Sequence, residues 1–241
     1  MKRLLALTAV AGAALVVGVS PALSTNECKG LQICLRVAGP WVVVPGTTST
    51  PRPTVSYQLS CPRGFIVGGL DAELSDRAID VGFRGALGSP VNPGITTARA
   101  ALFDATFTGR TARAVSFRPH LGCIPTSGGS GGPQPFLQPS AANAAAFAPG
   151  RPTVRRVSNV TLRAGSVQTV VRTCAAGEHV VSGWHAVGFY TTSAPSAALI
   201  TSVATSRTVR NGRVTVRVRT GFALAGVRAV VQVGAVCAGG S

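Results

Sequence analysis

The chain has 241 residues, with 23 lysines and arginines against only 7 acidic residues, and so carries a formal net charge of +16 at neutral pH. Such a charge favours anionic partners, among them wall polymers, acidic glycans, lipid head groups and nucleic acid. Aromatic residues make up only 5% of the chain and are not interleaved with the arginines, which argues against a module that recognises a specific nucleic acid.

Residues 1–24 have the parts of a cleavable signal peptide. Lys2 and Arg3 give a positive start, Leu4 to Val19 form an uncharged apolar stretch, and small residues follow at Ala22 and Ser24. We place the cleavage after Ser24, with Ala22 as the second choice. The alternative is an uncleaved membrane anchor, for which the apolar stretch is short. We therefore expect a secreted, extracellular protein.

The rest of the chain reads as an exported protein without a membrane span. Its most apolar segment, Phe222 to Gly240, is interrupted by Arg228 and Gln232. All six cysteines lie after the predicted signal peptide, and an even number of cysteines in an exported protein predicts disulfides. A zinc site is the weaker alternative, because no CxxC pair occurs and the histidines do not flank the cysteines at zinc-site spacing.

After an N-terminal segment, 25–40, two stretches of about 85 residues carry the same order of signals, at 41–125 and 156–240. Each has a hydroxyl residue, a cysteine and a glycine three residues further on, in Ser60-Cys61-Pro62-Arg63-Gly64 and in Thr173-Cys174-Ala175-Ala176-Gly177. Each then reaches Arg-Ala-Val and a closing cysteine, Cys123 or Cys237, which lies 62 or 63 residues after the first. This order predicts two tandem repeats.

Residues 126–155 form the predicted linker, which is rich in Ser, Gly, Pro and Ala. Within it, Gly128 to Gly132 matches the letters of the nucleophile elbow of serine hydrolases, with Ser130 in the nucleophile position. That motif needs a strand before it and a helix after it. Glycine and proline surround it here, so we interpret the segment as a flexible connection.

The repeats themselves read as strands. Val55, Tyr57, Leu59 and Cys61 alternate with polar residues, the period of a half-buried strand. Asn211-Gly212 lies between two such runs and is a strong signal for a two-residue hairpin turn. Helical periodicity is absent, so the predicted fold is all-β: two tandem disulfide-stapled antiparallel β-sandwich-like repeats joined by a Gly/Pro/Ser-rich linker.

The Cys61-Pro62-Arg63-Gly64 motif, followed by Gly68-Gly69, resembles a class of exported actinobacterial proteins that carry Cys-Pro-x-Gly β repeats closing on a late cysteine. The second copy, Cys174-Ala175-Ala176-Gly177, lacks the proline. The resemblance covers most of residues 55–123 and 168–237. It implies a fold and brings no activity or binding residues with it.

The repeat also predicts how the cysteines pair. Six cysteines allow 15 pairings, and spacing alone cannot choose between them. If equivalent positions form equivalent bonds, Cys61 pairs with Cys123 and Cys174 with Cys237. Cys28 and Cys34 then close a small loop in the N-terminal segment.

Two groups of titratable residues are candidates for chemistry. His179 and His185 would share a face of a continuous strand, although Gly183 lies between them and no third metal ligand is near; His120 has no special context. Four of the seven acids fall within ten residues, at Asp71, Glu73, Asp76 and Asp80. Their spacing fits no calcium loop, so we favour a surface loop paired with arginines and keep calcium as the alternative.

Four aromatic residues could line a carbohydrate or peptide site: Trp41, Tyr57, Trp184 and Tyr190. Aromatic side chains are common packing anchors in β proteins. We therefore expect them in the core or at its edge.

The Asn211-Gly212 turn fixes a predicted binding face. It places Arg210 opposite Arg213, with Arg217 and Arg219 further along the same side, and the valines of the alternate set facing inward. Arg207 falls on the inward set, where we expect the sheet edge to let its head reach water. The outward face then gathers Arg210, Arg213, Arg217 and Arg219 with almost no acid.

The sequence favours a non-catalytic extracellular module that contacts an anionic surface or polymer through this arginine-rich face, without a cofactor. A solvated, solubilising face is the plainer interpretation. The competing functional hypothesis is a secreted hydrolase of wall or glycan material, with its acid from residues 71–80 or from His179 and His185.

Overall fold

A computed structural model describes residues 25–84, 91–92, 95–96, 99–126 and 153–239. The predicted signal peptide and nearly all of the predicted linker, including Ser130, lie outside the described residues. The regular secondary structure of the described residues is nearly all antiparallel strand, 59% strand against 5% helix, which confirms the all-β prediction. No described helix is long and apolar enough to cross a membrane.

The described residues of the first half, which runs from 25 to 126, contain nine strands, two of them only two residues long. They are β1 (Leu35–Ala38), β2 (Trp41–Val44), β3 (Thr54–Ser60), β4 (Phe65–Leu74), β5 (Ile79–Arg84), β6 (Val91–Asn92), β7 (Ile95–Thr96), β8 (Ala100–Phe107) and β9 (Val115–Pro125). The second half contains six strands and two short helical turns. They are β10 (Val154–Thr161), β11 (Val167–Thr173), β12 (Glu178–Phe189), α2 (Ala197–Thr201), β13 (Val203–Arg210), β14 (Arg213–Thr220), the 3-10 turn η1 (Phe222–Leu224) and β15 (Ala229–Gly239).

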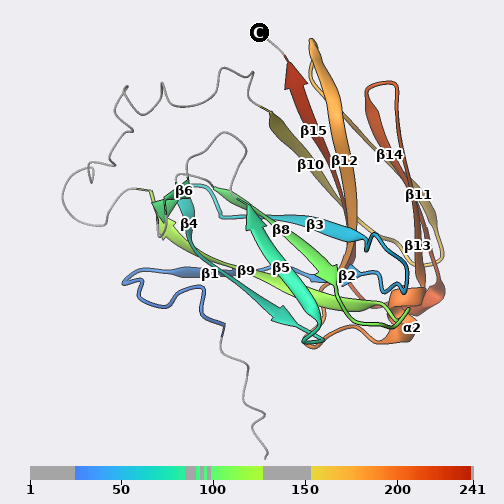
Figure 1. Cartoon of the computed structure of the whole chain (residues 1–241), viewed down its shortest axis with the longest axis horizontal. Helices are drawn as coiled ribbons and strands as arrows, with labels where there is room; N and C mark the ends of the chain where they lie inside the picture. Colours follow the sequence, from blue (N-terminus) through green and yellow to red (C-terminus); the bar gives the residue numbers. More distant parts are fainter. Residues whose placement is uncertain (1–24, 85–90, 93–94, 97–98, 127–152, 240–241) are drawn as a thin grey trace, which may run out of the picture.

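One large sheet runs through both halves (Figure 1). In the first half, β9 pairs with β4 along one side and with β1 and β2 in succession along the other. In the second half, β15 lies between β10 and β12. A short pairing of β2 with β12, at Val42 with Gly188 and Trp41 with Phe189, joins the two parts into one sheet.

A three-stranded sheet completes each half, β3-β8-β5 in the first and β11-β14-β13 in the second. Each encloses a separate core with its part of the large sheet. Val42 and Val44 face the first core, whereas Val43 packs against the second. Because side chains alternate along a strand, the two cores lie on opposite faces of the continuous sheet.

The two halves can be matched strand for strand. If β1 and β2 are counted as one strand and the two-residue β6 and β7 are left aside, each half has six strands. In each half, the sixth strand pairs with the first and the third, and the fifth pairs with the second and the fourth. The third strand has a register shift at the same place, between Val67 and Gly69 in β4 and between Val180 and Ser182 in β12. Two copies of one unit would give this match, and the repeat interpretation itself stays a prediction.

The cysteines pair as the sequence predicts. Cys61–Cys123 and Cys174–Cys237 each tie the turn after the second strand of a half to its closing strand, and Cys28–Cys34 closes the N-terminal loop. Each of the two turns contains a glycine in the left-handed region, Gly64 at φ 80° and Gly177 at φ 79°, a conformation that other residues avoid. This requirement explains the glycine shared by the two cysteine motifs.

The halves meet where the open edge of β3 abuts the face of β12 and β15. The Gln232 side chain is fully buried there, and its amide bonds both backbone groups of Gln58, accepting from the N–H at 2.6 Å and donating to the carbonyl at 2.9 Å. It also donates to the Asn159 side chain at 2.9 Å. At Gln58, this one glutamine supplies the two hydrogen bonds that a neighbouring strand would give to the edge of β3.

Candidate functional site

The hairpin of β13 and β14 has the predicted register throughout. Arg210 pairs with Arg213, and the alternation continues to Ala204 opposite Arg219. Asn211 and Gly212 both have positive φ, 49° and 68°, as a two-residue hairpin turn requires. The inward valines of β14 are completely buried: Val214, Val216 and Val218.

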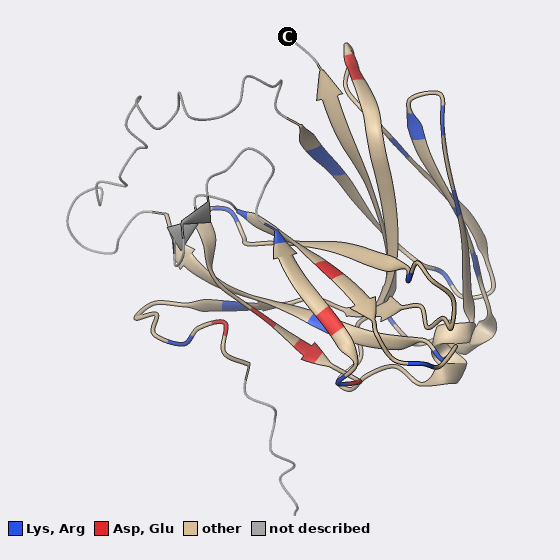
Figure 2. Ribbon diagram, in the orientation of Figure 1, with Lys and Arg blue, Asp and Glu red and all other residues tan. Residues whose placement is uncertain are grey.

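This packing turns four exposed arginines outward, which we call the basic face: Arg210, Arg213, Arg217 and Arg219. No acidic residue occurs in β11, β13 or β14, and the ribbons of this sheet carry blue without red in Figure 2. Exposed apolar side chains border the face, among them Val167 opposite Arg219 and, just after β14, Phe222, which is 84% exposed. The face therefore offers positive charge and an apolar margin together.

Arg207 differs in detail from the expectation. It is exposed at the edge strand β13, but its Nη1 also donates to the carbonyl of Gly183 in β12 at 2.7 Å. The head thus reaches back to the large sheet as well as to water. This contact ties the edge of the basic sheet to the strand behind it.

The structure separates His179 from His185. The register shift between Val180 and Ser182 inserts an extra residue, so His179 is exposed while His185 lies on the face of the second core. The His185 Nε2 lies 2.8 Å from the Thr205 hydroxyl. Burial, with the nearby charge of Arg207, lowers the pKa of His185, so the ring is neutral at neutral pH.

Three of the four clustered acids have separate partners, and the fourth is exposed. Asp71 accepts from the backbone of Asn26 at 2.5 Å, and Asp76 from that of Ala78 at 2.9 Å. Glu73 lies 3.8 Å from Arg118 and 3.6 Å from the His120 ring, and Asp80 is exposed. Among the described residues, the three metal-ligating side chains that converge are Cys174, Glu178 and Cys237, and the two cysteines are joined in a disulfide.

A buried carboxylate that the sequence did not indicate lies beside these acids. Glu27 is only 2% exposed, with Oε1 3.9 Å from the His120 ring and 3.7 Å from Arg36. Its backbone crosses the large sheet at Gly69 and Gly122, where a Cβ would lie 1.9 Å and 2.1 Å from the Glu27 carbonyl oxygen. The N-terminal loop can therefore lie flat on the sheet only because these two positions are glycine.

Three of the four aromatic residues are buried as expected, and Tyr190 is not. Trp41, Tyr57 and Trp184 are all at most 8% exposed. Tyr190 is exposed, and its ring stacks under the Arg228 guanidinium at 4.3 Å. The first three stabilise the core and its edges.

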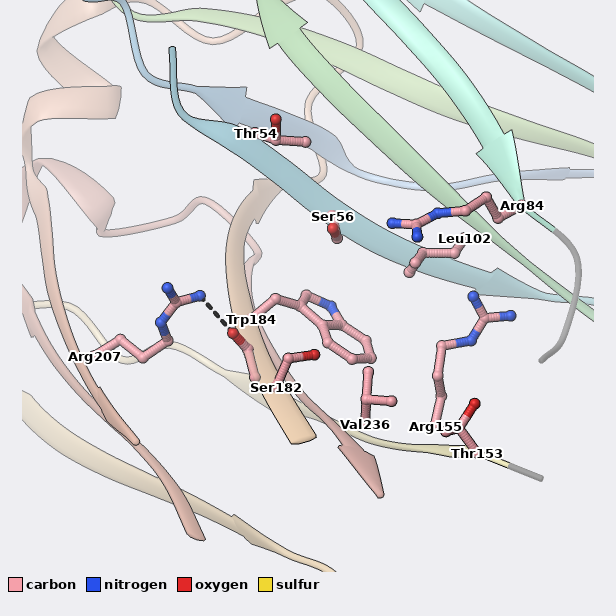
Figure 3. A pocket seen from close by; sticks show the side chains of 11 residues that line it. Thr54, Ser56, Arg84, Leu102, Thr153, Arg155, Ser182, Trp184, Arg207 and Val236 are labelled. Atoms are coloured by element: carbon pink, nitrogen blue, oxygen red, sulfur yellow. Dashed lines mark hydrogen bonds between the residues drawn. The ribbon is translucent and has the colours of Figure 1, made fainter. Parts of the chain in front are cut away.

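The structure also contains a cleft of about 360 Å³ that no sequence pattern indicated. It lies in the corner between β3-β8-β5 and the β12-β15-β10 face, and it is lined by three arginines, Arg84, Arg155 and Arg207 (Figure 3). Their strands are far apart in the sequence. Arg155 and Arg207 belong to the second half, and the packing of the first half against it brings Arg84 to the same cleft.

Comparison with protein-family models, with curated proteins and with solved structures finds no match. The resemblance to exported actinobacterial repeat proteins stays a prediction.

Proposed function

We propose that this protein is a secreted, non-catalytic binding module that contacts an anionic surface or polymer through the basic face. Three disulfides fit an oxidising, extracellular compartment. The predicted signal peptide, residues 1–24, is the reason to expect secretion. No cofactor or metal enters the proposal.

The observation that carries the proposal is the concentration of like charge on one exposed sheet. Arg210 and Arg213 lie directly opposite each other, a placement that destabilises a free sheet. No acid on β11, β13 or β14 relieves the repulsion. An anionic partner would relieve it and gain several charge-assisted hydrogen bonds at the same time.

The binding test replaces the four arginines of the basic face with glutamine. The matched control replaces four exposed arginines of the first half, Arg63, Arg77, Arg110 and Arg113, and so removes the same charge. The probes are vesicles with and without phosphatidylglycerol, and polygalacturonate. Each arginine near an anionic surface is worth about 1 kcal/mol, so we expect the basic-face variant to bind roughly a thousandfold more weakly and the control to bind almost normally.

Wild-type binding should also fall steeply as salt is added, and the basic-face variant should show a shallower salt dependence. The variant should melt slightly higher than the wild type, because the opposed charges are gone. Equal binding by the wild type and the basic-face variant at low salt would exclude this face as the contact surface.

A further inference from the structure

The cleft is a corner between two sheet surfaces. One wall is the outer face of the small sheet of the first half, with Ser56 on β3, Leu102 on β8 and Arg84 at the end of β5. The other wall is the face of the large sheet opposite the second core, with Trp184 on β12 and Arg155 on β10. Ligand sites are common at such junctions, and the volume is near the lower end of the range for small-molecule sites.

The inner end of the cleft is rigid. The hydrogen bonds between Gln232 and Gln58 fix the edge of β3 to β15. The Trp184 indole lies directly on Gly234, where a Cβ would be only 2.0 Å from the ring. Leu102 and Trp184 are buried and form an apolar base. The arginines around this base are therefore held by ordered structure on both walls.

Positive charge outweighs negative charge around the cleft. Arg84 donates from Nε to Asp104 at 2.5 Å, and Ser56 donates to the other oxygen of the same carboxylate at 2.5 Å. Asp104 pairs with Arg84, and its charge also acts on Arg155. The lining carries three arginines, so the formal charge of this group of side chains stays positive. In Figure 3, Arg84 and Arg155 reach from opposite walls on one side of Trp184, and Arg207 lies on the other side.

The two arginines of opposite walls are close enough to affect each other. Burial lowers the pKa of Arg155, and the charge of Arg84 lowers it further, with Asp104 acting in the opposite direction. A guanidinium remains charged in proteins. The fold therefore brings Arg84, Arg155 and Arg207 to one cleft with the Asp104 carboxylate beside them, and the remaining positive charge attracts a further anion.

We propose that this cleft binds a small anionic ligand, a carboxylate or phosphate carried on a sugar or polyol unit. The planar guanidinium groups suit the two oxygens of such a group. Hydroxyl groups of Thr54, Ser56, Thr153 and Ser182 also line the cleft and can bond the hydroxyls of the ligand. This site is separate from the basic face, whose four arginines do not line it.

The test is isothermal titration calorimetry of the mature chain at low salt with glucuronate, glucose 6-phosphate, inorganic phosphate and neutral glucose. Glucuronate and glucose 6-phosphate report the carboxylate and the phosphate source of the charge, and inorganic phosphate reports the charge without the sugar. We expect at least one anionic sugar to bind more tightly than inorganic phosphate, and glucose not to bind. Absence of binding by both anionic sugars, or equal binding of glucose, would overturn the proposal.

The deciding variant is Arg155→Gln, which should weaken binding of that sugar by about tenfold or more, since a hydrogen bond to a charged group is worth about 1.5–3 kcal/mol. Arg155→Lys keeps the charge but loses the planar fork, and should give an intermediate affinity. Asp104→Asn removes the one acid and should strengthen binding. Unchanged affinity in a folded Arg155→Gln protein would overturn the assignment.

The basic-face variant, with all four arginines changed to glutamine, is the matched control. It should bind the anionic sugar like the wild type while losing the vesicles and polygalacturonate. If instead it loses the sugar and Arg155→Gln does not, the sugar binds at the basic face and the cleft proposal fails. The two proposals therefore stand or fall on separate measurements.

Discussion

At the scale of single residues, burial lowers the pKa of two histidines, His185 and His120. The His185 ring is partly buried beside Thr205 and close to Arg207. Both surroundings oppose the charged form, the first through lost hydration and the second through like charge. Burial also lowers the pKa of His120, and the charges of Glu73 and Glu27 oppose this decrease.

These histidines predict that stability decreases in mild acid. The folded-state pKa of His185 lies below its usual 6.5, so the unfolded chain binds more protons once the pH falls towards and below that value. The free energy of unfolding should therefore be highest above about pH 6.5 and decrease as the pH falls through the interval between the unfolded and the folded pKa. Urea unfolding at a series of pH values measures this slope.

His185→Gln should flatten the pH dependence of unfolding, because it removes one of the groups that take up a proton on unfolding. His179→Gln is the control, since that side chain is exposed on the other face of the strand. A slope unchanged in His185→Gln and reduced in His179→Gln would contradict the assignment.

At the scale of elements, the β13–β14 hairpin shows what a local signal can determine. The turn residues and the period-2 alternation were enough to predict each pair from Arg210–Arg213 to Ala204–Arg219. They also predicted which side is buried, because only one side carries valines throughout β14. The contact of Arg207 with Gly183 was not predictable in this way, since it depends on a strand outside the hairpin.

The conformation of the Asn211-Gly212 turn predicts how substitutions there change the free energy of unfolding. Gly212 has φ +68° with open space around its Cα, so Gly212→Ala tests backbone conformation without a clash. We expect a loss of about 1 kcal/mol in the free energy of unfolding, measured in urea. Asn211→Gly should change stability by no more than about 0.5 kcal/mol, because glycine adopts positive φ readily. Equal losses in both variants would mean that the turn conformation is not what limits stability.

At the scale of the whole molecule, the sequence predicted the all-β fold and the three disulfides, but not how the two halves join. Landmarks such as Cys61 and Cys174 are visible because they recur in the chain. The pairing of β2 with β12 involves only two residue pairs and has no counterpart within either half. The cleft depends on that junction, so Arg84 and Arg155 could not be recognised as neighbours from the sequence.

Gln232 is the residue to test at this scale. Gln232→Ala would leave the N–H and carbonyl of Gln58 without the partner that bonds them and would open a small cavity. We expect a loss of about 2–4 kcal/mol in the free energy of unfolding. Asn159→Ala, which removes only one bond to the same glutamine, should cost about 1 kcal/mol. A loss for Gln232→Ala no greater than that for Asn159→Ala would show that the β3 edge does not need this side chain.

Strand β2 pairs with β9 of the first half and with β12 of the second, and this affects the order in which the molecule can fold. Trp41 can pair only once the chain has reached Phe189. Gln58 and its partner Gln232 are separated by 174 residues. Closing such a long loop is entropically costly, and contacts of this kind form late. The first half should therefore collapse around its own core with Ala186 still missing from it. During that interval β2 presents an unpaired edge, and the correct partner for it is the last part of β12 rather than another chain.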